Sequence, residues 1–402
     1  MRMARLLALV VLILVALVAP VQAATLAETK RVLAREMARA GTYSGAYVVD
    51  VGTGQELYAS RADTKRMPAS VEKLYTSATA MLLYGPEATL TTSVLANTLP
   101  DATGTITGNI VLRGGGDPTF GTTAAAELAE TLADSGLTEI TGRVIGDESA
   151  FDAFRGPPSS RFQTSSDVGP LSALAFNHGR TGQSRPYWQT SPARFAADAF
   201  EKALERRGVK IKGAARAGLA TTDMTPFSEH TSPSIATIAR QMNQPSDNFI
   251  AEMLIKGIGA QYGGEGSTAA GGKVMADTLQ QFGISPKIDD GSGLSRQNRT
   301  SPREVVQLLS GMATSEHAEE FDASLAVIGR NGTVSSRMRG TAAQDNCHAK
   351  TGTLRDVSAL AGYCTTTGGE RVAFAFMMNR VWPASARAIQ DRMTAALARY
   401  DA

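Results

Sequence analysis

The strongest constraint on this chain is a serine three residues before a lysine at the start of a predicted helix, in the segment Ser70-Val71-Glu72-Lys73. Pro68 and Ala69 suit a helix opening, and apolar residues recur at helical spacing as far as Leu82. Residues i and i+3 share one helix face, so the Lys73 amine should reach the Ser70 hydroxyl. A lysine can take a serine's proton if burial or another cation lowers its pKa. Alone, the pattern is more often an ordinary helix start followed by a solvated lysine.

Two further motifs follow in the chain. Ser246-Asp247-Asn248 opens an apolar helical stretch, and Lys350-Thr351-Gly352-Thr353 lies in an alternating stretch typical of a strand. Each has a simple alternative reading, a helix N-cap for the first and an edge strand with a solubilising lysine for the second. The three motifs in this order resemble the signature of penicillin-binding proteins and class A β-lactamases.

The resemblance implies a role for each motif residue. Ser70 would be the nucleophile and Lys73 its base, with Ser246 passing a proton to the leaving amine and Asn248 touching both Lys73 and the substrate. Lys350 would lower the pKa of Lys73 and help to bind a carboxylate. The expected substrate-binding residues are Thr351 and Thr353, through their hydroxyls, and Gly352, which leaves room beside the strand. The backbone amides of Ser70 and Thr353 would form the oxyanion hole.

The first two motifs are 176 positions apart, which requires an insertion relative to a compact class A β-lactamase. Residues 89–97, 105–113 and 139–147 read as strands and 124–135 as a helix, which predicts an inserted α/β domain over 86–230. The glycine-rich turn at 114–119 lacks the lysine and the helix start of a phosphate-binding loop.

Four segments make the resemblance more specific: Gly114–Thr119, Val144–Asp147, Gly169–Leu174 and Asp290–Arg296. They are similar to segments of the class C low-molecular-mass penicillin-binding proteins, which are D-alanyl-D-alanine carboxypeptidases and endopeptidases. The family implies an α/β (α+β) fold, in which an antiparallel sheet flanked by helices joins an all-helical subdomain. The catalytic domain would comprise 24–85 and 231–402. Well-known members carry a second insertion, for which the stretch 177–192 is too short.

The remaining sequence fits this fold. Helices are predicted over 25–40, 193–207, 232–243 and 385–400, and strands over 43–51, 56–60 and 371–379. Residues 348–354 and 357–363 should form a hairpin that turns at Arg355-Asp356. In that hairpin Cys347 and Cys364, the only two cysteines, would face each other, so a disulfide is predicted unless a bulge shifts the register.

Residues 1–23 read as a signal peptide, with Arg2 and Arg5 before a short apolar run and a small-residue cleavage site at Ala23. A retained membrane anchor is the alternative, although the run is short for a spanning helix. Either reading places the protein outside the cytoplasm, periplasmic or secreted. Without that segment the charges balance, so nothing indicates a nucleic-acid partner.

The predicted function is a serine peptidase that cleaves peptidoglycan stem peptides, needs no cofactor or metal and is acylated by β-lactams. The four histidines lack paired zinc spacing, and no Gly-x-Ser-x-Gly elbow occurs. A β-lactamase is the nearest alternative, but no Glu-x-x-x-Asn segment for a deacylating water lies between Asn248 and Lys350. An esterase of the same fold and a scaffold that binds peptidoglycan without cutting it also remain open. The sequence leaves the oligomeric state undetermined.

Overall fold

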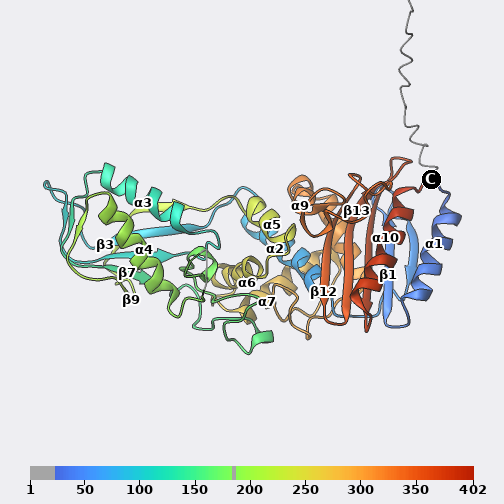
Figure 1. The fold of residues 1–402 in the computed structure, drawn as a ribbon, viewed down its shortest axis with the longest axis horizontal. Helices are drawn as coiled ribbons and strands as arrows, with labels where there is room; N and C mark the ends of the chain where they lie inside the picture. The colour runs from blue at the N-terminus through green and yellow to red at the C-terminus, as the bar shows by residue number, and fades with distance from the viewer. Residues whose placement is uncertain (1–22, 183–186) are drawn as a thin grey trace, which may run out of the picture.

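The computed structural model describes residues 23–182 and 187–402. The molecule is elongated, with a sheet and its terminal helices at one end, a group of helices in the middle and a smaller α/β unit at the other end (Figure 1). The predicted signal peptide lies outside the described residues except for Ala23. Within the described ranges, no helix is both long and apolar enough to cross a bilayer.

The larger sheet has six antiparallel strands in the order β11-β12-β13-β14-β1-β2. They are β1 (Ser44–Asp50), β2 (Glu56–Ser60), β11 (Ala326–Val327), β12 (Cys347–Leu354), β13 (Val357–Thr365) and β14 (Arg371–Asn379). Alternate residues of β14 enter different cores, Phe374 and Phe376 on the face covered by α1 (Leu26–Arg39) and α10 (Pro383–Ala398), Ala373 and Ala375 on the other. β2 and β14 have the predicted bounds.

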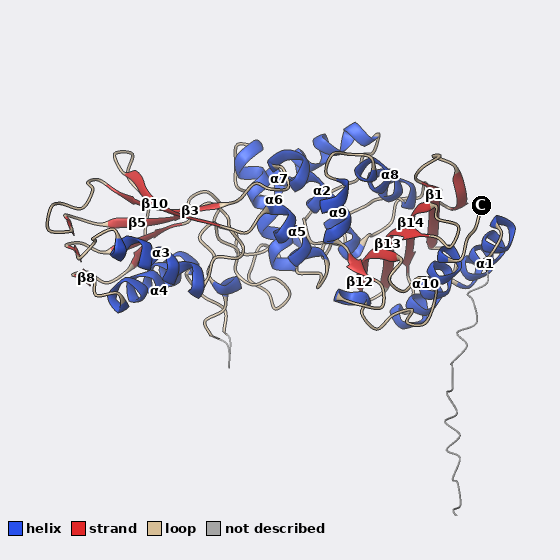
Figure 2. Cartoon of the chain, turned by 90° about the horizontal axis from the view of Figure 1, so that it is seen from above, coloured by secondary structure: helices blue, strands red, loops and turns tan. Residues whose placement is uncertain are grey.

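Helices cover the second face of this sheet and fill the middle of the molecule (Figure 2). The 3₁₀ helix η1 (Ala69–Glu72) leads directly into α2 (Lys73–Tyr84). Around α2 lie α5 (Ile235–Asn243), α6 (Asn248–Tyr262), α7 (Thr268–Leu279) and α9 (Ala318–Ser324), and α8 (Pro302–Ala313) packs on the sheet beside α9. The predicted fold class, an antiparallel sheet flanked by helices with a helical subdomain and an inserted α/β unit, is confirmed.

The edge of the sheet nearest these helices is open along part of its length. β11 pairs only with His348 and Ala349 of β12. In the described part of the chain, no strand pairs with the outer side of β12 from Lys350 to Leu354. An extended peptide could therefore lie beside this stretch.

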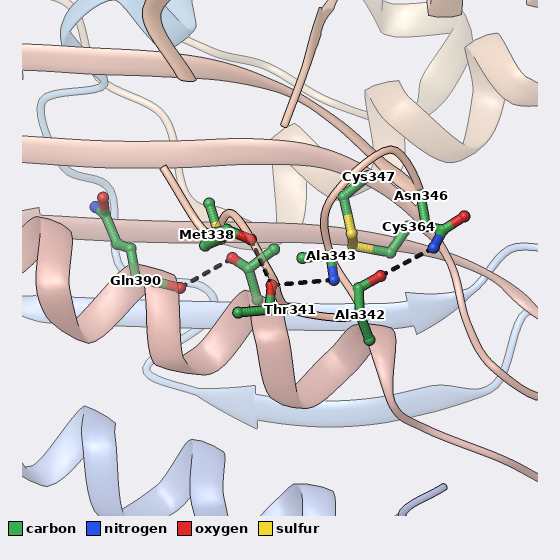
Figure 3. The surroundings of a disulfide bond; sticks show 9 residues. Met338, Thr341, Ala342, Ala343, Asn346, Cys347, Cys364 and Gln390 are labelled. Atoms are coloured by element: carbon green, nitrogen blue, oxygen red, sulfur yellow. Dashed lines mark hydrogen bonds between the residues drawn. A yellow bond between two sulfur atoms is a disulfide. The ribbon is translucent and has the colours of Figure 1, made fainter. Parts of the chain in front are cut away.

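The cysteines occupy the predicted register, since Cys347 of β12 is directly opposite Cys364 of β13. They form a disulfide, with Cα atoms 4.1 Å apart, at the end of the hairpin away from its turn (Figure 3). The hairpin register is regular from this bond to Leu354 and Val357. The bulge that would have separated the two cysteines is absent from this hairpin.

The inserted unit contains a five-stranded sheet and a three-stranded sheet. The first sheet has the order β10-β3-β5-β7-β9 and the second has the order β4-β6-β8. Two helices, α3 (Thr122–Asp134) and α4 (Pro192–Arg206), contribute side chains to the hydrophobic core of the inserted unit. The strands are β3 (Thr91–Ala96), β4 (Thr105–Ile106), β5 (Ile110–Gly114), β6 (Glu139–Ile140), β7 (Val144–Asp147), β8 (Lys210–Ile211), β9 (Arg216–Ala217) and β10 (Thr225–Thr231).

Two predicted strands, 105–113 and 139–147, were wrong as continuous elements because each is broken near a glycine. Gly142 N–H donates to Gly108 O, and Gly213 N–H donates to Gly142 O, both over 2.8 Å. A Cβ at Gly142 would lie 2.4 Å from Gly108 O, so the two backbone segments approach too closely there for a side chain.

The segment 148–176, between β7 and α4, leaves the inserted sheet and packs on α6. Leu171 and Ala173 of this segment share a buried cluster with Phe249 and Met253. The boundaries 86 and 230 stay a prediction, but the described contacts join the inserted segment firmly to the helix that begins at Asn248.

Candidate active site

Ser70 lies in η1, between the helical part of the molecule and the open edge of β12. A Cβ on Gly352 would lie 2.5 Å from Pro68 O and 3.1 Å from Ser70 N. We expected Gly352 to leave room for substrate, whereas here its missing side chain lets β12 approach the backbone beside the serine. Ala69 has φ 49°, a left-handed conformation that costs about 1–2 kcal/mol for a non-glycine residue. Such strain is common where a nucleophile is presented.

Lys73 makes three contacts that define the centre of the site. Its Nζ lies 3.2 Å from Ser70 Oγ, 2.7 Å from Asn248 Oδ1 and 2.6 Å from the Ser292 carbonyl oxygen. The structure therefore brings the first two motifs together as predicted. Ser292 comes from the loop 289–296, to which the sequence assigned no chemical role.

The lysine side chain is completely buried, and this burial lowers the pKa of Lys73 to about 8. Asp290, Glu252, Asp247 and Glu72 act in the opposite direction, because a negative charge on any of them favours the ammonium form. We had expected Lys350 to lower this pKa, but burial is the leading cause. Lys73 is thus poised to gain or lose a proton near neutral pH.

Lys350 is also completely buried, on β12, and its Nζ donates to the Thr351 carbonyl oxygen over 3.0 Å. Burial is the main cause that lowers the pKa of Lys350, and repulsion from the charge of Lys73 lowers it further. The neighbouring hydroxyls both have protein partners. Thr351 Oγ1 lies 2.7 Å from Thr333 Oγ1, and Arg387 donates to Thr353 Oγ1 over 3.3 Å.

The Ser246-Asp247-Asn248 motif forms a helix start as well as part of the site. Asp247 Oδ1 accepts from Ile250 N–H over 2.9 Å, which makes Asp247 the N-cap of α6. Ser246 has φ 66°, and its hydroxyl has no hydrogen-bond partner within 23–182 and 187–402. Asn248 Nδ2 donates to the Asp167 carbonyl oxygen over 3.1 Å, so the inserted segment touches the motif.

Three buried carboxyl groups near Lys73 escaped the sequence analysis. Asp290 accepts from the Gly293 and Ser295 amides and from Asn298, whereas neither carboxyl oxygen of Glu72 has a partner among the described residues. Burial raises the pKa of Glu72 well above its usual range and that of Glu252 to about 8. Burial thus favours the neutral form of Glu72. For Glu72 and Glu252 the signal in the sequence was an acidic residue at an otherwise apolar helical position, whereas Asp290 lies in the segment 290–296 that the resemblance had already singled out.

The chain matches the model of the D-Ala-D-Ala carboxypeptidase 3 (S13) family over residues 27–183 and 180–400. A D-alanyl-D-alanine carboxypeptidase from Actinomadura sp. is 30% identical over 445 residues, covering 90% of this chain and 82% of that protein. Carboxypeptidase DacB from Mycolicibacterium smegmatis is 30% identical over 413 residues, covering 94% and 86%.

Solved structures show the same fold. Penicillin-binding protein 4 from Haemophilus influenzae superimposes with a TM-score of 0.76 at 20% identity, covering 90% of this chain and 97% of that chain. A predatory peptidoglycan endopeptidase from Bdellovibrio bacteriovorus superimposes with a TM-score of 0.60 at 18% identity, covering 89% and 92%. From the match to the family model and the two relatives, we conclude that this chain belongs to the D-Ala-D-Ala carboxypeptidase 3 (S13) family.

Proposed function

We propose that this protein is a serine-type D-alanyl-D-alanine carboxypeptidase in which Ser70 is the nucleophile and Lys73 its general base. The observation that carries the proposal is the set of contacts around Lys73 Nζ. Asn248 Oδ1 and Ser292 O are carbonyl-type oxygens, which only accept hydrogen bonds. When Lys73 is neutral, its two N–H groups are occupied by these oxygens and its lone pair is left for the Ser70 proton, across 3.2 Å.

The reaction follows from this arrangement. Ser70 Oγ attacks the carbonyl carbon of the penultimate D-alanine as its proton passes to Lys73, and the amides of Ser70 and Thr353 bind the oxyanion. The C–N bond then breaks, and the departing amine of the terminal D-alanine takes the proton through Ser246. Water finally attacks the acyl-enzyme, which releases the shortened peptide and restores the Ser70 hydroxyl.

The substrate would be a peptidoglycan stem peptide lying beside the open edge of β12. Its terminal carboxylate would bind near Lys350, Thr351 and Thr353, while the approach made possible by Gly352 keeps the Thr353 amide beside Ser70. The same groups would cleave a D-alanyl bond within a cross-link, so endopeptidase activity belongs to this proposal.

β-Lactams should acylate Ser70 because they present a strained amide and a carboxylate in similar positions. Among the relatives in fold, the Haemophilus influenzae protein has been solved with a β-lactam and a Bdellovibrio bacteriovorus endopeptidase acylated by penicillin G. A periplasmic or secreted location after cleavage at Ala23 completes the proposal.

The test is to incubate purified residues 24–402 with a fluorescent penicillin and to follow covalent labelling by gel and intact mass. Ser70→Ala should abolish labelling. Ser60→Ala, on the opposite edge strand β2, is the matched control and should label normally. Labelling of the Ser70→Ala variant would refute the nucleophile, and rapid release of hydrolysed drug would indicate a β-lactamase instead. Release of D-alanine from a stem pentapeptide then measures the peptidase activity directly.

A further inference from the structure

Ser292, whose carbonyl receives a hydrogen bond from Lys73, is itself held through its N–H by a buried glutamate. Glu252 lies on α6, one turn after Asn248, and its Oε1 accepts from the Ser292 N–H over 2.9 Å. The carbonyl of the same residue, Ser292, accepts from Lys73 Nζ over 2.6 Å. Glu252 and Lys73 are thus connected through a single residue of the loop 289–296.

We propose that Glu252 is a positioning residue for the catalytic lysine, acting through Ser292, an assignment that rests on the nucleophile and base proposed above. Glu252 does not reach Ser70 or Lys73 by any hydrogen bond in the described part of the chain. Its effect is to hold the Ser292 carbonyl where it occupies one N–H of Lys73, so that the lone pair stays directed at Ser70.

Other contacts fix the loop 289–296 on either side of Ser292, but they do not bind the Ser292 N–H. Thr76 Oγ1 donates to the Gly291 carbonyl over 2.7 Å, and Asp290 accepts from Gly293 and Ser295. Gly293 has φ +84°, and a Cβ there would lie 1.9 Å from Ala69 O, so the loop backbone lies against the residue before the nucleophile. Among these anchors, Glu252 alone binds the Ser292 amide.

The charge of Glu252 matters as well as its hydrogen bond. The groups around Lys73 are Glu72 from η1, Asp247 and Glu252 at α6, Asp290 from the loop and Lys350 from β12. Burial raises the pKa of Asp290, and the three hydrogen bonds that Asp290 accepts oppose this rise, whereas Glu252 accepts one on Oε1 and none on Oε2. A neutral carboxyl at 252 still accepts from Ser292 without favouring the ammonium form of Lys73. Ionisation of Glu252 at alkaline pH would favour that ammonium form and so displace the rise of the acylation rate to higher pH.

The experiment measures the second-order rate of acylation by fluorescent penicillin as a function of pH for three variants. Glu252→Gln keeps a hydrogen-bond acceptor for Ser292 and should retain the rate at pH 7 within a few-fold. It should shift the rising limb of the profile to lower pH, because no negative charge develops beside Lys73. Glu252→Ala should lower the rate by about 10²-fold, since the Ser292 carbonyl is no longer held. Glu36→Ala, which removes another fully buried glutamate on the far face of the sheet, should lower stability but leave rate and profile unchanged.

Three outcomes would overturn the proposal: a Glu252→Ala rate within two-fold of the wild type, a Glu252→Gln variant as slow as Glu252→Ala, or a Glu252→Gln profile that is not shifted. If Glu252→Ala fails to fold, as a thermal melt would show, the rate and profile of Glu252→Gln decide. Ser70→Ala is measured in parallel. If that variant is still labelled, the proposed nucleophile has failed, and this result is distinct from any result at Glu252.

Discussion

At the residue scale, the buried state of Lys73 predicts how acylation depends on pH. Only the neutral amine can take the Ser70 proton, and a pKa of about 8 leaves about a tenth of it neutral at pH 7. The acylation rate should therefore rise by close to ten-fold per pH unit below 7 and level off above 8 to 9. Stopped-flow or quenched labelling between pH 5.5 and 10 measures this. A flat profile across that range would contradict the assignment of Lys73 as the base.

A second residue prediction concerns Gly352. An alanine there would place its Cβ 2.5 Å from the Pro68 carbonyl oxygen, so β12 must move away from η1. Overpacking of this kind typically costs about 1–3 kcal/mol. Gly352→Ala should lower both the free energy of unfolding and the acylation rate, because the Thr353 amide moves away from Ser70. Gly369→Ala serves as a control, since the space around that exposed turn glycine is open, although its φ of +93° adds some strain. Chemical denaturation together with penicillin labelling would test both effects.

The three motifs could be identified from the sequence because each is defined by residue types at short spacing. In the structure Lys73 contacts both Ser70 and Asn248, as expected. Ser292 could not be found in this way because it contributes a backbone carbonyl, which every residue possesses. Asp167 contributes to the site in the same manner. Glu252 and Glu72 were hidden for another reason, because a buried acid in an apolar helix reads as an irregularity until its neighbours are known.

At the scale of elements, the hairpin β12–β13 should depend on its disulfide for stability rather than for chemistry. Cys347 and Cys364 are 17 positions apart, and a closed loop of this size contributes about 3 kcal/mol by restricting the unfolded chain. The Cys347→Ala/Cys364→Ala variant should lose about that much stability while keeping its acylation rate, since the bond lies at the end of β12 before Lys350. Urea denaturation and labelling check both parts. Two free thiols by Ellman titration of unreduced, denatured protein would show that the bond is not formed.

Some strands could be predicted from the sequence pattern and others could not. β2, β14 and the hairpin β12–β13 were predictable because alternation and turn residues specify them locally. The strands broken at Gly108 and Gly142 were not, because an isolated glycine in an alternating run signals either a weak strand or a bend. The triplets Ile106-Thr107-Gly108, Ile140-Thr141-Gly142 and Ile211-Lys212-Gly213 repeat at the three bends, and this repeat is the signal that could have revealed them.

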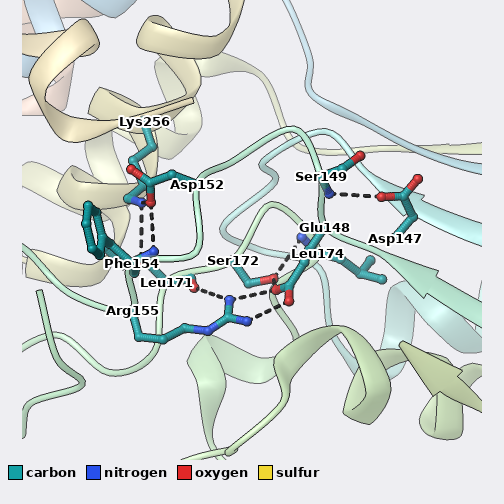
Figure 4. A network of polar contacts seen from close by, with 10 residues as sticks. All are labelled: Asp147, Glu148, Ser149, Asp152, Phe154, Arg155, Leu171, Ser172, Leu174 and Lys256. Carbon is teal, nitrogen blue, oxygen red and sulfur yellow. Dashed lines mark hydrogen bonds and ion pairs between the residues drawn. The ribbon is translucent and has the colours of Figure 1, made fainter. Parts of the chain in front are cut away.

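At the scale of the whole molecule, a polar network fastens the inserted segment 148–176 to the helix that carries Asn248. Lys256 of α6 forms an ion pair with Asp152 and donates to the Phe154 carbonyl oxygen over 3.2 Å (Figure 4). Arg155 pairs with Glu148 over 2.6 Å within the same segment. Since the Asp167 carbonyl of this segment holds the Asn248 amide, the insertion should support the geometry of the active site as well as add a domain.

This coupling predicts that breaking the Lys256–Asp152 pair weakens both stability and acylation. The side chain of Lys256 is 1% exposed and that of Asp152 is 16% exposed, so Asp152→Ala strands the more deeply buried charge and should be the more harmful single change. Removing one partner of a buried pair typically costs about 3–5 kcal/mol, and the Lys256→Met/Asp152→Leu double variant should recover much of this because no charge remains buried.

Lys202→Met is the control, because it breaks a pair whose side chains are 58% and 46% exposed and should cost under about 0.5 kcal/mol. Urea denaturation gives the stabilities, and the acylation rate reports the position of Asn248. If Asp152→Ala destabilises the protein but acylates at the wild-type rate, the insertion stabilises α6 without positioning Asn248.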